Sequence, residues 1–271
     1  MLRSLLNLLK EPEIKKLNVD DPSTVEIHKQ MIQKKPLLLD VYSSYYNKFV
    51  NVSKRVPSGL QVEIGSGGGF LKKYLPDVIT SDILDLPHID KVFSAENIEL
   101  ADSTVSAFYL LDVFHHIKNP RQFFNEIERC LIPDGRLVMI EPANTFWGRF
   151  IRKNFHHEPH DERAGWEMNG SNPMSDANLA LPWIVFFRDR NLFEQEFPNL
   201  SIVRYKNHTP LRFLLSGGIT YRSIIPVFMT PIVKIAEYLL SPFNGFLGMH
   251  VTIEIKKISS KKSISRSDKR E

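Results

Sequence analysis

The sequence has few of the features that mark secreted, fibrous or membrane-spanning proteins. It contains one cysteine in 271 residues, so no internal disulfide can form, and such cysteine usage is typical of a reducing, cytoplasmic setting. No uncharged apolar run approaches the roughly 20 residues that a bilayer requires. The leucine-rich start is followed directly by charges, and we expect no signal peptide. Hydrophobic residues at 42% and charged residues at 24% predict an ordinary globular protein.

The net charge is also close to zero over most of the chain. The formal net charge is +4, but residues 256–271 contain seven basic and two acidic residues, a net +5, which leaves −1 for residues 1–255. A neutral body without a basic patch argues against a nucleic-acid partner. The serine- and lysine-rich tail is expected to be disordered.

Hydrophobic periodicity divides the chain into five segments. Residues 1–56 predict a helical cap, and residues 57–142 alternate strands with helices, which predicts an α/β core. Residues 143–248 hold an insertion, one further core strand and an apolar helical region. They are followed by a last strand at 249–255 and the tail at 256–271. The whole predicts a doubly wound, mostly parallel, seven-stranded Rossmann-like sheet.

Individual elements can be assigned within this plan. Helices are expected from Ser23 to about Lys35, from Pro36 to about Val50, from Gly67 to Leu75 and, capped by Asn119, from Pro120 to Leu131. The seven expected strands are Leu60–Ile64, Val78–Ser81, Val92–Phe93, Val105–Leu111, Arg136–Ile140, 200–205 and His250–Ile255.

A glycine-rich loop follows the first expected strand. It contains Gly65, Gly67 and Gly69, and it lets a ligand lie against bare backbone beside the free N–H groups of a helix start. Asp82 ends the second strand, where a carboxylate can accept both hydrogen bonds of a ribose diol. A dinucleotide fingerprint would need a third glycine at position 70, which is Phe70. The loop therefore predicts a nucleotide-like ligand other than a dinucleotide.

The loop, with Glu63 before it, resembles the first motif of class I S-adenosylmethionine-dependent methyltransferases. The resemblance continues in family order with Ser94-Ala95-Glu96, with the strand end Leu110–Ile117, with Pro133-Asp134-Gly135 and with a strand ending in Glu141-Pro142. It covers residues 60–142 and is similar to the small-molecule, quinone-biosynthesis (methyltransferase type 11) branch. Ser94 departs from the pattern, since the family usually has an acid there.

The resemblance implies a cofactor, S-adenosylmethionine, and a role for each matching residue. The glycines would line its methionine and ribose portions, Glu63 would orient the amino-acid portion, and Asp82 would take the ribose hydroxyls. Ala95 and Glu96 would flank adenine, and Asp112 would face the cleft between cofactor and acceptor. The reaction would be in-line displacement at the sulfonium methyl, for which the protein mainly supplies alignment.

An oxygen acceptor also needs a group that takes its proton, and histidine is the usual one. The candidate catalytic residues are His115, His116 and His156. Alternatively, the pair at 115–116 only packs beneath the fourth strand. The polar run at 156–162 could be a solvated loop or a metal site, and we expect no metal. The candidate substrate residues are Tyr42, Tyr46, His157, His160 and Trp166.

The apolar region at 213–248 holds only three charged residues and leaves three interpretations open. It could complete the core of a helical subdomain, form a pocket for an apolar or lipid-linked acceptor, or lie in a membrane interface, with the basic tail attracted to anionic lipid. We predict a methyltransferase that acts on a small or lipid-linked apolar acceptor at oxygen. The alternatives are an NAD-dependent oxidoreductase and a non-catalytic membrane-surface module. The sequence does not determine the oligomeric state.

Overall fold

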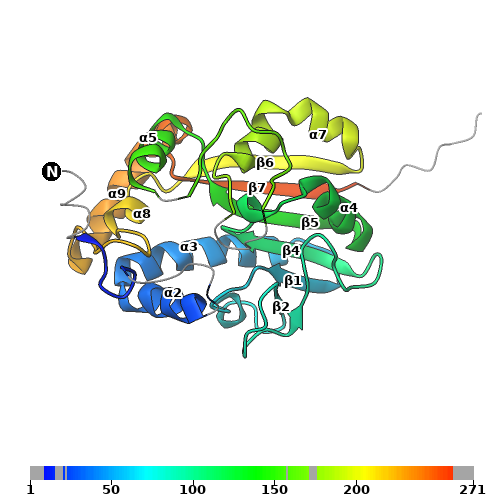
Figure 1. The fold of residues 1–271 in the computed structure, drawn as a ribbon, viewed down its shortest axis with the longest axis horizontal. Coiled ribbons are helices and arrows are strands. Elements are labelled where there is room, and N and C mark those ends of the chain that lie inside the picture. Colours follow the sequence, from blue (N-terminus) through cyan, green and yellow to red (C-terminus); the bar gives the residue numbers. More distant parts are fainter. Residues whose placement is uncertain (1–8, 16–20, 22, 157, 171–175, 259–271) are drawn as a thin grey trace, which may run out of the picture.

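Seven strands form one sheet in a computed structural model that describes residues 9–15, 21, 23–156, 158–170 and 176–258 (Figure 1). The spatial order is β3-β2-β1-β4-β5-β7-β6. Strands β1 to β5 run parallel, and β7 is antiparallel to both β5 and β6. The strands are β1 (Leu60–Ile64), β2 (Ile79–Asp82), β3 (Lys91–Val92), β4 (Val105–Leu111), β5 (Leu131–Pro142), β6 (Leu200–His208) and β7 (His250–Lys257). The predicted doubly wound, mostly parallel sheet is confirmed.

Helices surround this sheet, and most of those expected from the sequence are present. They are α2 (Ser23–Lys34), α3 (Pro36–Ser53), η1 (Leu71–Lys73), η2 (Phe114–His116), α4 (Pro120–Cys130), α5 (Phe146–Phe155), α6 (Leu181–Trp183), η3 (Ile184–Arg188), α7 (Arg190–Glu196), α8 (Arg212–Leu215), η4 (Val227–Met229), α9 (Thr230–Leu240), η5 (Ser241–Phe243) and α10 (Asn244–Leu247). Asn119 caps α4 as expected, because its side chain accepts a hydrogen bond from the Gln122 backbone N–H at 3.0 Å.

The expected helix from Gly67 to Leu75 is wrong. Only the short 3₁₀ turn η1 follows the glycine loop. Gly65, Gly67 and Gly69 all have φ between +47° and +67°, a left-handed conformation that an α-helix cannot include. Pro76 then limits how far the chain can continue as a helix. Strand β5 is longer than expected and includes the predicted turn at 133–135.

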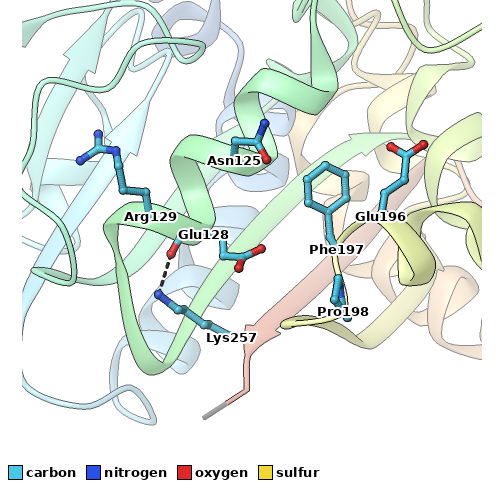
Figure 2. Close-up of a pocket in the computed structure, with 7 residues that line it drawn as sticks. All are labelled: Asn125, Glu128, Arg129, Glu196, Phe197, Pro198 and Lys257. Carbon is cyan, nitrogen blue, oxygen red and sulfur yellow. Dashed lines mark hydrogen bonds between the residues drawn. The ribbon is translucent and has the colours of Figure 1, made fainter. Parts of the chain in front are cut away.

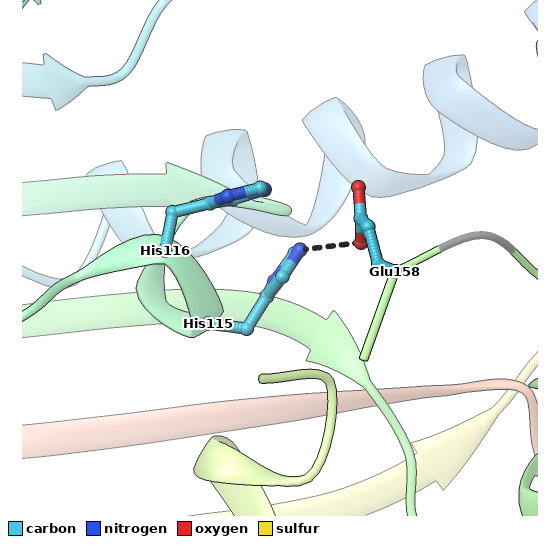
Figure 3. Close-up of side chains that lie close together, drawn as sticks. All are labelled: His115, His116 and Glu158. Carbon is cyan, nitrogen blue, oxygen red and sulfur yellow. Dashed lines mark ion pairs between the residues drawn. The ribbon is translucent and has the colours of Figure 1, made fainter. Parts of the chain in front are cut away.

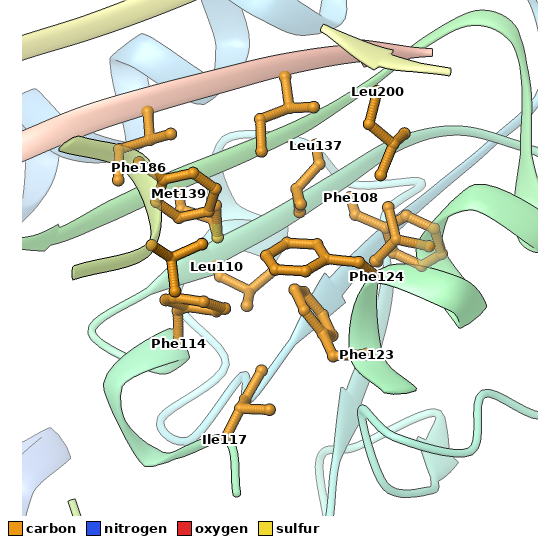
Figure 4. Packing of buried hydrophobic residues seen from close by; sticks show 14 of the residues in the cluster. Phe108, Leu110, Phe114, Ile117, Phe123, Phe124, Leu137, Met139, Phe186 and Leu200 are labelled. Carbon is orange, nitrogen blue, oxygen red and sulfur yellow. The ribbon is translucent and has the colours of Figure 1, made fainter. Parts of the chain in front are cut away.

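Alternating side chains of the central strands build two cores. Phe108 and Leu110 of β4 face one side, where they pack with α4, α6, η3 and α7 (Figure 4). Ala107 and Tyr109 face the other side and pack against α3. Every one of these four side chains is buried. Burial on both faces fixes the strand register, because a shift by one residue would exchange the two cores.

This topology brings the strand ends to one place. The strand order reverses between β1 and β4, and in open α/β sheets ligands bind at such a switch point, beyond the carboxyl ends of the strands. The glycine loop after β1 and the segment from Asp112 after β4 therefore meet at the same edge. His250, which opens β7, is paired with Pro142 at that edge.

Candidate active site

The glycine loop after β1 leaves one side of its backbone open. A Cβ atom added to Gly67, which has φ +47°, would meet nothing within 4 Å. The same atom on Gly65 would lie 2.5 Å from Val113, and on Gly69 it would lie 2.6 Å from His88. Gly65 and Gly69 are therefore needed for packing inside the protein, whereas Gly67 borders the open side, where a ligand can approach the backbone.

Two carboxylates, Glu63 and Asp82, flank the loop. Asp82 accepts hydrogen bonds from the backbone N–H of Gly67 at 2.9 Å and of Leu84 at 3.1 Å, which fixes its orientation at the end of β2. Glu63 is buried, and one of its carboxylate oxygens has no hydrogen-bond partner. Burial raises the pKa of Glu63 to about 8. An orphaned buried acid beside an open glycine fits a ligand that carries an ammonium group, as the amino-acid part of S-adenosylmethionine does.

The expected adenine contacts are partly used inside the protein. One carboxylate oxygen of Glu96 accepts hydrogen bonds from the backbone N–H groups of Lys118 and Asn119 at 2.9 and 3.0 Å. Glu96 thus fixes the loop before α4, and Ala95 packs against the core at its side. Their contact with adenine stays a prediction.

Strand β4 ends at Leu111, and the chain turns sharply at the next residue. Asp112 has φ +55°, a left-handed conformation that costs a non-glycine residue on the order of 1 kcal/mol and is typical of functional sites. Burial, reinforced by the nearby Glu141 carboxylate, raises the pKa of Asp112 to about 7. Its carboxylate lies 3.7 Å from Nε2 of His250. Asp112 is therefore poised to change charge near neutral pH.

His115 lies between two carboxylates. Its Nδ1 is 2.7 Å from an oxygen of Glu141, and its Nε2 is 3.5 Å from an oxygen of Glu158 (Figure 3). Burial alone would lower the pKa of His115, but the two carboxylates outweigh it and raise the pKa to about 10. His115 therefore carries its proton at neutral pH and is poorly suited to accept another one.

His116 differs from its neighbour. Burial and the adjacent His115 cation lower its pKa to about 4, so its ring is neutral at pH 7. Its Nδ1 is buried and has no hydrogen-bond partner. His115, His116 and Glu158 together bring three ligand atoms within 4.8 Å of one another. They could hold a divalent cation only after His115 loses its proton, and the expected absence of a metal stays a prediction.

Helix α3 carries the two predicted tyrosines along its buried side. The rings of Tyr42 and Tyr46 lie 6.3 Å apart, one helical turn from each other. Tyr46 also contacts Phe70, 6.4 Å between centroids, directly after the glycine loop. Burial, and the nearby Asp112 carboxylate, raise the pKa of Tyr42, so its hydroxyl keeps its proton. Both tyrosines thus pack in the core beneath the N-terminal helices, and their contact with a substrate stays a prediction.

The remaining predicted residues are scattered. Nδ1 of His156 accepts a hydrogen bond from the Glu158 backbone N–H at 3.2 Å, and His157 lies outside the described residues. Both ring nitrogens of His160 are buried without a hydrogen-bond partner. Trp166 does not fit its predicted substrate role: its Nε1 donates to Asp189 at 2.9 Å, and its ring is buried under Arg121. Trp166 packs between α4 and α7 because its polar atom finds its partner there.

Sequence reasoning missed four residues of the site: Glu141, Glu158, Arg152 and His250. Glu141 is fully buried and also accepts hydrogen bonds from the N–H groups of Val113 and Phe114, so it holds the turn after β4. Arg152 of α5 is buried and donates to the carbonyls of Ala143 and Met249. A charged residue at a strand end was the available signal for Glu141. Glu158 lies in the polar run at 156–162, and no local pattern identifies Arg152 or His250.

A hollow lies in another part of the molecule. It measures about 480 Å³ and is lined mainly by charged and polar residues at the end of α4 and around Lys257 (Figure 2). Lys257 ends β7, on the edge opposite His250, so this hollow is remote from the glycine loop. No predicted site residue lines it.

The fold, the glycine loop and the two carboxylates at the strand ends define a class I S-adenosylmethionine-dependent methyltransferase. Residues 62–139 match the family model of the type 11 methyltransferase domain. The match covers the part of the chain from the glycine loop to strand β5, and it supports S-adenosylmethionine as the cofactor.

The solved structures that this chain resembles are distant in sequence. A methyltransferase from Thermotoga maritima, described as a possible histamine N-methyltransferase, is 18% identical, with 86% of this chain and 99% of that chain covered and a TM-score of 0.48. Geranyl diphosphate C-methyltransferase from Streptomyces coelicolor is 13% identical, with 92% of each chain covered and a TM-score of 0.44. No curated protein matches the sequence significantly. None of the helices in the described residues is both long and apolar enough to span a membrane.

Proposed function

We propose that this methyltransferase methylates an oxygen atom of a small or lipid-linked apolar acceptor, and that Asp112 accepts the proton that the acceptor loses. The observation that carries the proposal is the surrounding of Asp112. Tyr42 and His250 are buried beside it. A partly buried carboxylate of pKa about 7 suits a hydroxyl that must be deprotonated as it reacts.

His115 and Glu141 near Asp112 belong to the cofactor-binding core, but other side chains around it come from elsewhere in the chain. Tyr42 belongs to α3, and His250 opens β7. Phe213 of α8 packs edge-on against His250, 4.6 Å between ring centroids. The Tyr45 hydroxyl lies 3.0 Å from Nδ1 of His250 and fixes the ring from the other side. These aromatic groups favour an apolar acceptor over a charged one.

S-adenosylmethionine, when bound, supplies a methyl group that is already activated on a sulfonium. The residues that would hold it are Glu63, Gly67 and Asp82. The work left to the protein is to align the acceptor oxygen and to remove its proton. Glu141 and Glu158 hold the charge of His115 in place beside Asp112, which makes His115 a positioning residue in this proposal.

The other two predicted catalytic histidines differ in how well they could accept the proton. His116 is neutral and close to the site, so it remains the second candidate for the proton acceptor. His156 is half exposed and lies at the end of α5. Cys130 is buried and its pKa is raised by burial, in keeping with a packing role.

The alternatives from the sequence have less support. An NAD-dependent oxidoreductase would need a glycine where Phe70 packs against Tyr46, and an α-helix where only η1 follows the loop. A non-catalytic module would not need the orphaned acid Glu63 beside an open glycine.

The test is radiolabelled methyl transfer from S-adenosylmethionine to matched apolar acceptors that carry a hydroxyl, an amine or a thiol. We expect transfer to the hydroxyl compounds, with loss of transfer but normal cofactor binding in Asp112→Asn. Methylation of amines or thiols alone would contradict the choice of oxygen. Full activity of Asp112→Asn would show that Asp112 is not the proton acceptor.

A further inference from the structure

Helix α9 packs with its charged side toward the rest of the protein. The Glu237 carboxylate is buried and accepts hydrogen bonds from the backbone N–H groups of Leu211 and Arg212 at 2.9 and 2.8 Å. Lys234 is paired with Asp40 of α3, and Arg212 bridges Asp40 and Glu237. The polar residues of α9 thus hold it against α3 and α8, which is the reverse of an ordinary surface helix.

The opposite side of α9 and the turn before it present large apolar side chains outward. We call this surface the apolar face; it consists of Val227, Phe228, Ile232, Ile235, Tyr238 and Leu239. Phe228 is 76% exposed, Tyr238 77% and Leu239 67%. Four of the six recur at intervals of four, three and four residues, the period of a helix face. None of the six carries a charge.

Helix α10, which follows α9 through η5, and α5, which contacts α10, carry further exposed aromatic and basic residues. Phe146 of α5 stacks on Phe246 of α10 at 4.7 Å, and both are more than half exposed. One and two turns further along α5, Arg149 and Lys153 share a single partner, Glu162, which leaves one positive charge in excess. An apolar stripe beside basic residues is typical of a helix that lies in a membrane interface.

The size and chemistry of the apolar face decide between occupants. The six side chains expose on the order of 700 Å² of largely apolar surface, whereas the largest patch on a monomer is about 300–600 Å². A protein partner on such an area would form roughly ten hydrogen bonds. The face offers only the Tyr238 hydroxyl among its six side chains. A lipid surface requires no such partners.

We propose that the apolar face docks this methyltransferase on a bilayer that contains anionic lipid. The inference rests on the proposed function and names the place from which its acceptor comes. The face is joined to the site through α8, since Arg212 bonds to Glu237 of α9 and Phe213 packs on His250. A small apolar hollow lined by Trp147, Pro210, Leu211 and Leu247 lies between α5, α8 and α10.

The position of the basic tail separates this proposal from simple charge attraction. The described chain ends at Ile258, just after β7, at the edge of the sheet opposite His250 (Figure 1). Residues 259–271 are thus attached far from the apolar face, although the two are neighbours in the sequence. Docking through the face does not depend on the tail.

The test is sedimentation of the full-length protein with vesicles of phosphatidylcholine and phosphatidylglycerol, compared with phosphatidylcholine alone. The variant Phe228→Ser/Ile235→Ser/Leu239→Ser removes three exposed side chains, and we expect it to bind vesicles at least about tenfold more weakly. The matched control is Phe187→Ser, which removes a side chain that is 63% exposed on η3. The control and a variant ending at residue 258 should bind like the full chain.

Other occupants give distinct results. Failure of the full chain to bind vesicles would overturn the proposal, and so would vesicle binding that appears only after residues 1–8 are removed, because those residues would then cover the face. Concentration-dependent dimerisation without lipid, abolished by the triple substitution, would identify a second copy as the occupant. Cofactor affinity, measured by calorimetry on the same proteins, separates a failed docking surface from a failed methyltransferase.

Discussion

Replacing Gly67 by alanine tests whether the open side of the glycine loop is the cofactor site. The new methyl group meets no protein atom within 4 Å, so its folding cost comes from the backbone alone. A left-handed conformation, φ +47° here, costs alanine about 1–2 kcal/mol. For a chain of this size, that lowers the melting temperature by roughly 2–8 °C. The protein should remain folded.

Cofactor binding should suffer more than folding. If the cofactor lies against the bare backbone of Gly67, the added methyl group overfills that space. Overpacking of this kind costs about 1–3 kcal/mol, which corresponds to a roughly five- to 150-fold larger dissociation constant. Isothermal calorimetry with S-adenosylmethionine measures the loss, and denaturant unfolding measures the stability of the same protein.

Two further alanine variants serve as controls. In Gly65→Ala the Cβ lies 2.5 Å from Val113, so stability should fall further, by about 1–3 kcal/mol in addition to the backbone cost. In Gly165→Ala the Cβ meets nothing within 4 Å and the backbone is ordinary, so both measurements should stay unchanged. Wild-type affinity in Gly67→Ala, with Gly165→Ala behaving as expected, would show that the cofactor does not contact this side of the loop.

Three other perturbations follow from the charges of the site. Folding raises the pKa of Glu63 to about 8, so its contribution to stability is complete below pH 4.5 and disappears as pH rises through 8. The variant Glu63→Gln should therefore gain stability relative to wild type between pH 5 and 8, as measured by urea unfolding. Methyl transfer should rise with pH through about 7 as Asp112 ionises, and a flat profile would contradict that role. Glu141→Gln should lower the free energy of unfolding by about 3–5 kcal/mol, because it leaves the buried His115 cation without its nearest partner; a loss under 1 kcal/mol would mean that His115 is neutral.

The sequence by itself determined the plan of the core. Short apolar runs between helices and turns predicted a strand at all seven places, because such runs are a local signal of buried strands. Asn119 and Pro120 marked the start of α4 through local hydrogen bonding and a fixed φ. The glycines and Asp82 predicted a nucleotide-like ligand, and the resemblance of this stretch, with Glu63, to class I methyltransferases implied S-adenosylmethionine.

The tertiary structure alone decided which charges are available. Nothing local to His115 indicates that Glu141 and Glu158, 26 and 43 positions away in the sequence, hold its proton. The pKa values of Glu63 and Asp112 depend on burial, which the fold creates. Likewise, the composition of 213–248 showed an apolar segment but not whether its apolar side chains face the core or the surface. The ion pairs of Lys234 and Glu237 with distant partners turn its apolar side outward.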